Sequence, residues 1–337
     1  MSESRQTFSK TSQNGQSHSH IHYRSLINLL LKTRFQLISN HVRATKLAAV
    51  DFHAVRFTRA GPMHYLEEID FKTPEFGDLY DELPLWSAHF GLMLLENVTL
   101  RSGITILDVG AGTGFMTIEL AQRCGSKSQV IAVDPWEAAI KRLNRKLNQI
   151  GIENVRTLVQ DAATIDLPDE SVDLIVSNLG INNFDDPQAA LRTCFRIAKP
   201  EARLFLTTNL VGHMAEFYEA YRSVLLELGF SDRIAALDAH INHRATVDSV
   251  KTLLAQEGFE FVKATMYTFR ERFVDGSALM RHYFIRLGFV PGWKSIAPAG
   301  AVEQTFAALE HRLNTIAVEQ GELSLTIPAA CIEAYKP

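Results

Sequence analysis

Cysteine is scarce in this sequence, and so are long apolar runs. The 337 residues include three cysteines, Cys124, Cys194 and Cys331, whose spacing fits neither a metal site nor a disulfide framework. We therefore expect a protein of the reducing cytoplasm without a bound metal. The longest apolar run near the N-terminus, residues 26–31, contains Asn28 and is much too short to span a bilayer. The sequence thus predicts no stable membrane insertion.

The sequence also lacks a large charge of one sign. Its formal net charge is −4, which gives no reason to expect a nucleic-acid partner. The charge is uneven, because residues 1–60 hold nine Lys or Arg residues and two acidic residues. We expect residues 1–62 to form a disordered or weakly ordered basic extension, and residues 63–337 to form the folded domain. The extension could be a transit peptide, a membrane-surface segment or a stretch without function, and we favour the last.

Between residues 100 and 210, apolar segments typical of buried strands alternate with helical segments. The predicted strands are 105–109, 130–134, 155–160, 172–177 and 203–208. The predicted helices are 115–123, 136–150 and 187–198. This alternation predicts an α/β fold that is doubly wound around a mostly parallel sheet. Ligands of such sheets bind beyond the carboxyl ends of the strands.

The most informative segment follows the first predicted strand. Residues 106–114 read Ile-Leu-Asp-Val-Gly-Ala-Gly-Thr-Gly, and a helical pattern begins directly at Phe115. A glycine turn between a strand and a helix lets a ligand approach the backbone and directs free N–H groups toward it. Asp134 lies 20 residues after Gly114, at the end of the next strand, where a carboxylate can bind both hydroxyls of a ribose. Together these features predict a site for an adenosine-bearing cofactor.

Details of the turn separate two kinds of cofactor. The dinucleotide fingerprint is G-x-G-x-x-G, whereas here the third glycine comes one residue earlier. Asp108, two residues before Gly110, would repel a pyrophosphate but attract the ammonium and sulfonium groups of S-adenosylmethionine. Asp161 follows the third predicted strand, where it can accept a hydrogen bond from an adenine amino group. From about Tyr80 to Asn209, the chain resembles the class I S-adenosylmethionine-dependent methyltransferases that act on small molecules.

The resemblance implies a role for each strand-end residue. The glycine loop and Asp108 would hold the methionine part of the cofactor, Asp134 the ribose, and Asp161 the adenine. Trp136 would stack on the adenine, and Asn178 would border the acceptor. The residues that the resemblance assigns to cofactor binding are Tyr80, Trp86, Asp108, Gly110, Ala111, Gly112, Gly114, Asp134, Pro135, Trp136, Asp161, Ala162, Asn178 and Leu179. Tyr80 and Trp86 resemble a lid helix, although plain core aromatics would give the same pattern.

The pattern changes after Asn209. Helical segments at 214–228 and 246–257 precede a strand at 259–273, and a last strand is predicted at 323–333. By the resemblance, these two strands complete a seven-stranded Rossmann-like sheet, in which one of them is antiparallel. The helices predicted at 277–287 and 301–320 then form an insertion before the last strand. We expect residues 275–320 and 76–98 to be lid elements on the acceptor side of a cofactor-binding core at 100–210.

Methyl transfer from a sulfonium requires alignment and exclusion of water, and it needs a base only when the acceptor is protonated. The candidate bases are His240, His243, His282 and Tyr283. We favour His282 as the catalytic residue because it falls in the predicted lid. Arg244, Arg281 and Arg286 could hold a carboxylate on the acceptor.

We therefore predict a cytoplasmic methyltransferase with S-adenosylmethionine as cofactor. It would transfer the methyl group to a small-molecule acceptor by in-line displacement. Two alternatives stay open at this point. One is a nicotinamide-dependent oxidoreductase, against which the early third glycine and Asp108 argue. The other is a protein that binds S-adenosylmethionine without catalysis. The sequence leaves the acceptor and the oligomeric state open.

Overall fold

The computed structural model describes residues 63–70, 73–81 and 85–337, which belong to one compact unit. The prediction of a disordered or weakly ordered extension at residues 1–62 lies outside the described residues. In the part of the chain that is described, no helix has both the length and the apolar character needed to cross a membrane.

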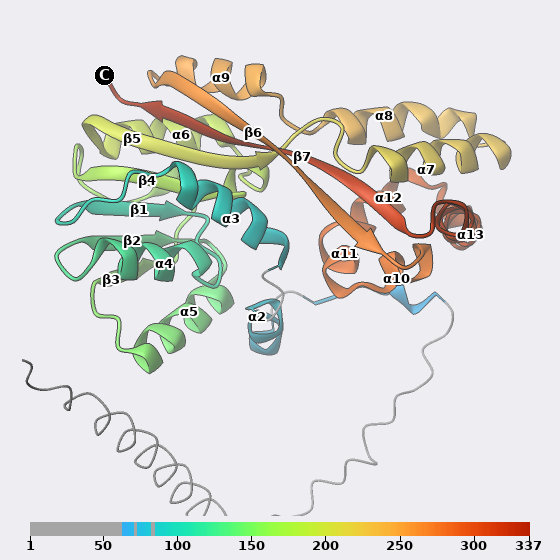
Figure 1. The fold of residues 1–337 in the computed structure, drawn as a ribbon, viewed down its shortest axis with the longest axis horizontal. Coiled ribbons are helices and arrows are strands. Elements are labelled where there is room, and N and C mark those ends of the chain that lie inside the picture. Colours follow the sequence, from blue (N-terminus) through green and yellow to red (C-terminus); the bar gives the residue numbers. More distant parts are fainter. Residues whose placement is uncertain (1–62, 71–72, 82–84) are drawn as a thin grey trace, which may run out of the picture. The chain divides into compact units, whose positions relative to one another are not determined.

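Within the described residues, seven strands form one sheet in the order β3-β2-β1-β4-β5-β7-β6 (Figure 1). Their bounds are Thr105–Val109 (β1), Gln129–Val133 (β2), Val155–Leu158 (β3), Val172–Asn178 (β4), Ala198–Asn209 (β5), Glu260–Phe273 (β6) and Leu323–Tyr335 (β7). The first five strands pair in parallel, whereas β7 is antiparallel to both β5 and β6. This topology confirms the predicted doubly wound, mostly parallel Rossmann-like sheet.

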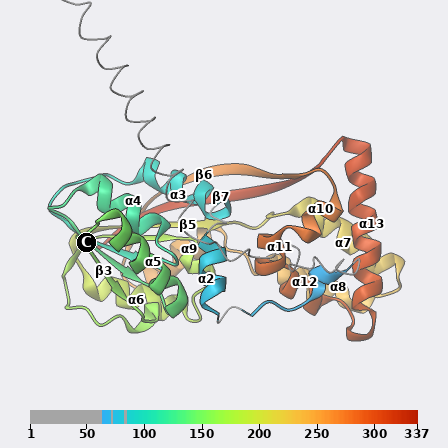
Figure 2. The same cartoon turned by 90° about the horizontal axis from the view of Figure 1, so that it is seen from below.

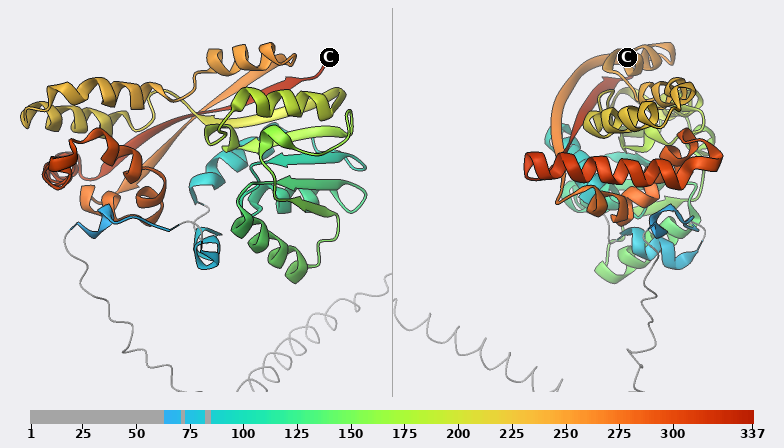
Figure 3. Two further views of the ribbon diagram at one scale, coloured as in Figure 1. Left: turned by 180° about the vertical axis from the view of Figure 1, so that it is seen from behind. Right: turned by 90° about the vertical axis from the view of Figure 1, so that its right-hand side faces the viewer.

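Helices cover both faces of the sheet because successive strand residues point to opposite sides. In β2, Val130 and Ala132 face one layer, while Ile131 and Val133 face the other. The first layer contains α3 (Leu85–Asn97), α4 (Phe115–Cys124) and α5 (Glu137–Ile150), and the second contains α6 (Pro187–Ile197) and α9 (Val247–Gln256) (Figure 3). Both faces are therefore buried, as parallel strands of this kind require.

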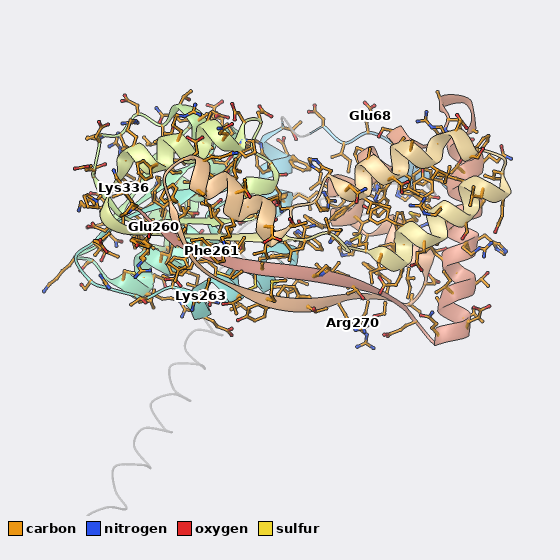
Figure 4. The ribbon with its side chains drawn as sticks, turned by 90° about the horizontal axis from the view of Figure 1, so that it is seen from above. Glu68, Glu260, Phe261, Lys263, Arg270 and Lys336 are labelled. Carbon is orange, nitrogen blue, oxygen red and sulfur yellow. The ribbon has the colours of Figure 1, made fainter. Side chains whose placement is uncertain are left out.

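The strands β6 and β7 continue past the rest of the sheet. The last residue of β5, Asn209, pairs with Ala329, so residues 323–328 of β7 pair with β6 alone. The far half of this ribbon supports α7 (Ala215–Glu227), α8 (Ile234–Asn242), α10 (Gly276–Arg281), α11 (Tyr283–Gly288), α12 (Val290–Ile296) and α13 (Val302–Gln320) (Figures 1 and 2). We call these six helices the helical lobe. Figure 4 shows β6 and β7 from above. Lys263 marks the half of β6 beside the rest of the sheet, and Arg270 marks the half beside the helical lobe.

The predicted helical insertion before the last strand is confirmed, but its details differ from the prediction. The helix predicted at 277–287 is interrupted at His282, whose extended ψ of 126° separates α10 from α11. The helices α8 and α12 were not predicted. Several strand bounds also differ by one or more residues. The largest difference is in β5, which begins at Ala198 rather than at Arg203, and β3 ends at Leu158 rather than at Gln160. Asp161 therefore lies in a loop beyond its strand.

Candidate functional site

The glycine loop between β1 and α4 needs its glycines for two different reasons. Gly110 has φ +76°, and a Cβ atom there would lie 3.0 Å from the Cα atom of Gly180. Gly112 has φ +53°, and a Cβ atom there would meet nothing within 4 Å. Both backbone conformations are strained for residues with a side chain. The first glycine thus packs against the loop after β4, while the space above the second is open to a ligand.

Asp134 joins the glycine loop to the end of β2. Its Oδ2 accepts a hydrogen bond from the Gly112 N–H at 2.8 Å, and its Oδ1 accepts one from the Trp136 N–H at 2.9 Å. Burial raises the pKa of Asp134 above its ordinary value, although these two bonds oppose the shift. Each oxygen of an ionised carboxylate has two lone pairs, so each can accept one further donor. This fits the two hydroxyls of a ribose.

Asp108 is the most deeply buried acid of the site, with 1% of its surface exposed. Its Oδ2 accepts a hydrogen bond from the Thr117 hydroxyl at 2.6 Å. Burial raises the pKa of Asp108 to about 7, and the nearby charge of Asp134 adds to this shift. A bound cation would offset the cost of ionising such a carboxyl group. The side chain therefore suits the positively charged end of S-adenosylmethionine.

An aromatic cluster flanks Asp134. The ring of Trp136 lies 5.2 Å from that of Tyr80 and 5.6 Å from that of Phe76, both in α2 (Pro74–Asp81). Burial, followed by the charge of Asp134, raises the pKa of Tyr80. The Trp136 Nε1 is buried and has no hydrogen-bond partner among the described residues. The structure thus brings Tyr80 and Trp136 together beside Asp134, with the exposed Pro135 between Asp134 and Trp136.

Salt bridges hold α2 against α5. The carboxylate of Asp81 binds Arg142 Nε at 2.8 Å and Lys146 Nζ at 2.5 Å. The side chain of Asp81 is only 11% exposed, so these are partly buried contacts. Tyr80 and its neighbours in α2 therefore sit over the strand ends through contacts that the local sequence alone does not reveal.

The remaining predicted cofactor residues lie at the ends of β3 and β4. Asp161 is exposed and accepts from the Ala163 N–H at 2.8 Å, which caps a short 3-10 helix that begins at the buried Ala162. Asn178 donates to the Ser87 carbonyl at 3.1 Å and accepts from the Thr207 hydroxyl at 2.8 Å. Leu179 is buried beside it. The Asn178 amide thus fastens the end of β4 to α3 and β5.

Trp86 lies in a different aromatic cluster from Tyr80. Its ring packs 5.5 Å from His213, 5.4 Å from Phe284 and 5.4 Å from Phe289. These partners belong to the loop after β5 and to the helical lobe, whereas Tyr80 packs beside Asp134. The contacts of Trp86 therefore do not bring it beside Asp134, and its assignment to cofactor binding stays a prediction.

His282 is not brought to the strand ends. It is exposed at the junction of α10 and α11, and its ring packs 5.6 Å from Phe273, the last residue of β6. Burial of part of the ring lowers its pKa. The neighbouring Arg281 forms a salt bridge with Glu310 at 2.6 Å. The described contacts do not bring His282 to the cofactor residues, and its role as the catalytic group stays a prediction.

The sequence prediction missed His213, which is 2% exposed. This residue follows the end of β5 by four positions, and its Nδ1 and Nε2 have no hydrogen-bond partner among the described residues. Burial, followed by the charge of Arg244, lowers the pKa of His213 to about 3. Its position just after a strand end was the one signal in the sequence that could have identified it, because the other polar site residues share that position.

A family model described as "Methyltransferase domain" matches residues 100–258. The ubiquinone/menaquinone biosynthesis C-methyltransferase UbiE of Escherichia coli is 31% identical over 173 residues, which cover 48% of this chain and 69% of that protein. The protein of the same name from Salmonella arizonae is 30% identical over 173 residues, with the same coverage. The crystal structure of the YcgJ protein from Bacillus subtilis has a TM-score of 0.51 at 16% identity, covering 74% of this chain and 98% of that one. This structural likeness shows the fold alone.

Proposed function

This chain belongs to the class I S-adenosylmethionine-dependent methyltransferases of the small-molecule type, and we propose that the carboxyl ends of β1 to β4 form its cofactor site. The family excludes the oxidoreductase alternative. The observation that carries the site proposal is the 2.8 Å bond between the Gly112 N–H and Asp134. It makes the glycine loop and the ribose acid parts of one structure rather than two separate sequence features.

The remaining strand-end residues support the same placement of the cofactor. Asp108 lies under the loop, where its carboxylate suits an ammonium or sulfonium group. Trp136 lies next to Asp134 and offers an aromatic face for the adenine. Asp161 lies at the next strand end with an exposed carboxylate that can accept from the adenine amino group. Charge, shape and position along the sheet therefore all fit S-adenosylmethionine.

When bound, S-adenosylmethionine supplies an electrophilic methyl group, and S-adenosylhomocysteine is left as a neutral thioether. The protein has to orient the two reactants and keep water away from them. Asn178 lies where β4 ends and is fixed by Ser87 and Thr207. We assign it to the border between the cofactor and the acceptor. The buried rings of the helical lobe would exclude water on the acceptor side.

The acceptor does not follow from the relatives. The matched family model ends at residue 258, whereas α10 to α13 lie between residues 276 and 320. Phe284 of α11 and the adjacent Phe289 pack on Trp86, so this part of the insertion would shape the acceptor side of the chain. The quinone-pathway activity in the names of the two enterobacterial relatives is therefore not assigned to it.

Two measurements test the function. In isothermal titration calorimetry, S-adenosylhomocysteine should bind one site per chain, and NADH should not bind. In the presence of S-adenosylmethionine, a panel of oxygen, nitrogen, carbon and sulfur acceptors should contain at least one that causes release of S-adenosylhomocysteine. Tight binding without release across the whole panel would instead support the non-catalytic alternative. Absence of S-adenosylhomocysteine binding would refute the proposed cofactor site.

A further inference from the structure

Two loops meet beyond the carboxyl end of β5. The loop after β5 carries His213, and the connection between α8 and α9 carries Arg244. The Val211 N–H donates to the Ala245 carbonyl at 3.1 Å, which holds the two loops side by side. Because β5 is the neighbour of β4, both loops lie on the side of the sheet next to Asn178.

The imidazole of His213 is buried between two aromatic rings. Its ring stacks 5.5 Å from Phe289 and lies edge-on to Trp86, also at 5.5 Å. Neither ring nitrogen has a hydrogen-bond partner among the described residues. Buried polar groups in folded proteins almost always form hydrogen bonds, so two buried nitrogens without a hydrogen-bond partner suggest that a ligand binds there. A neutral imidazole offers one donor and one acceptor to such a ligand.

Arg244 adds a positive charge beside His213. Its Nε is buried and unpaired, and among the described residues no carboxylate oxygen lies within the 4.0 Å of a salt bridge. The titratable groups around it are His213, His240 and Tyr218. Burial, followed by the charge of Arg244, lowers the pKa of both histidines, so both are neutral near pH 7. The cluster therefore carries a positive charge that an anion would balance.

A chain of contacts links this cluster to the proposed site of methyl transfer. Asn178 donates to the carbonyl of Ser87, and the next residue toward the N-terminus, Trp86, packs on His213. Trp86 and Phe284 stack at 5.4 Å and remain partly exposed, whereas His213 and Phe289 are buried. An acceptor would therefore approach His213 past two flat apolar rings that face solvent in part.

We propose that His213 and Arg244 bind the methyl acceptor, and that this acceptor is a flat apolar organic anion with a carboxylate or another acidic oxygen. This inference rests on the proposed methyltransferase function and adds the chemical class of its acceptor. Arg244 pairs with the anionic oxygen, since a guanidinium forms its strongest hydrogen bonds with such oxygens. His213 binds a second polar atom of the acceptor. The rings of Trp86 and Phe284 contact its flat body.

The first experiment compares a charged probe with its uncharged analogue. Binding of 1-naphthoate and 1-naphthamide is measured by calorimetry on the full chain saturated with S-adenosylhomocysteine. The wild type should bind the carboxylate at least about tenfold more tightly, because only the carboxylate forms a charge-assisted bond. Arg244→Gln should abolish this preference. Arg222→Gln, which removes a guanidinium paired with Asp238 on the outside of the same lobe, should retain it.

The outcomes of this experiment are separable from failure of the proposed function. If S-adenosylhomocysteine does not bind, the proposed cofactor site is wrong. If it binds but 1-naphthoate binds no better than 1-naphthamide, or not at all, the acceptor inference is wrong and the cofactor site stands. A preference that survives in Arg244→Gln also overturns the inference, because Arg244 would then not be the anion partner.

A second experiment does not depend on the probe. His213→Phe replaces the unpaired imidazole by a ring that fits between Trp86 and Phe289. If His213 is kept for binding rather than for folding, the variant should melt at or above the wild-type temperature, because an unpaired buried polar group is removed. Its affinity for S-adenosylhomocysteine should be unchanged, and its methyl transfer should be lost. A melting temperature several degrees lower would mark His213 as structural and overturn the inference.

Discussion

Replacing Asp134 by alanine should weaken cofactor binding about 100-fold. Its two oxygens each accept one backbone N–H, from Gly112 and from Trp136, and each has one lone pair left for a ribose hydroxyl. A hydrogen bond to a charged group contributes about 1.5–3 kcal/mol. Two such bonds at the lower end of this range give about 3 kcal/mol, which corresponds to about 100-fold in Kd. Asp134→Asn keeps one acceptor oxygen, so its Kd should lie between those of the wild type and Asp134→Ala.

The assay for this prediction is calorimetric titration with S-adenosylhomocysteine, together with the melting temperature of each unliganded variant. Asp166→Ala serves as the control, because Asp166 is an exposed acid in the same region after β3 and has no assigned role. Its affinity should equal that of the wild type. If Asp134→Ala folds normally and its Kd changes less than about threefold, the ribose does not lie at Asp134 and the reasoning is refuted.

Four further predictions concern the same site. The pKa of Asp108 without cofactor is about 7, and only its ionised form attracts the cofactor ammonium. The affinity for S-adenosylhomocysteine should therefore rise by up to about tenfold per pH unit from about pH 5 to 7 and then stay constant. In the same titrations, the affinity of Asp108→Asn should not change with pH. In the folded protein Asp108 keeps its proton at pH values where the unfolded chain has lost it. Asp108 should therefore lower the stability of the unliganded protein as pH rises from about 4 to 7. Thermal melts should show this decrease in the wild type relative to Asp108→Asn. Gly110→Ala should lower the free energy of unfolding by at least about 1 kcal/mol, because φ is +76° and the new Cβ atom would lie 3.0 Å from Gly180; an unchanged denaturation midpoint would contradict this. Asp81→Ala should speed amide hydrogen exchange in Pro74–Asp81 while leaving α13 unaffected, since it removes the partly buried contacts to α5. Equal exchange in both proteins would show that the other contacts of α2, its aromatic residues and the salt bridges of Asp78, are enough to hold it.

The sheet could be predicted from the sequence because its signals are local. The strands β1, β2 and β4 are short apolar runs that precede the helices α4, α5 and α6. Start signals such as Asp186, which caps α6 through the Ala189 N–H at 2.9 Å, mark these helices in the sequence. The early start of β5 was missed because residues 198–202 include Pro200 and Glu201, which are unfavourable within strands.

The helical lobe was only partly predictable. The helix α12 contains Pro291 and Gly292, which normally signal a turn. It forms because Trp293 is fully buried and stacks 3.9 Å from Phe217 in α7, a contact between residues far apart in sequence. Tertiary packing of this kind overrides local propensity and leaves no pattern in a single segment. The break at His282 is another example.

Local sequence signals identify the proposed cofactor residues, whereas the proposed acceptor residues are brought together only by tertiary contacts. Asp108, Asp134 and Asp161 could be predicted because each lies at or just beyond the carboxyl end of its own strand, and the glycine loop marks the first of these ends. His213 and Arg244 were not assigned together because they lie 31 positions apart in the sequence and meet only through the Val211–Ala245 backbone bond. His282 was favoured on sequence position within the lid, and the fold then placed it at the far end of the β6–β7 ribbon.

A crystal structure of the full chain with S-adenosylhomocysteine bound is the most direct test of the central claim. The ribose hydroxyls should bond to Asp134, the adenine should stack on Trp136, and the sulfur should lie beside Asn178 on the side facing His213. A cofactor bound elsewhere, or bound with its sulfur directed away from His213, would contradict the proposed site and the path of the methyl group.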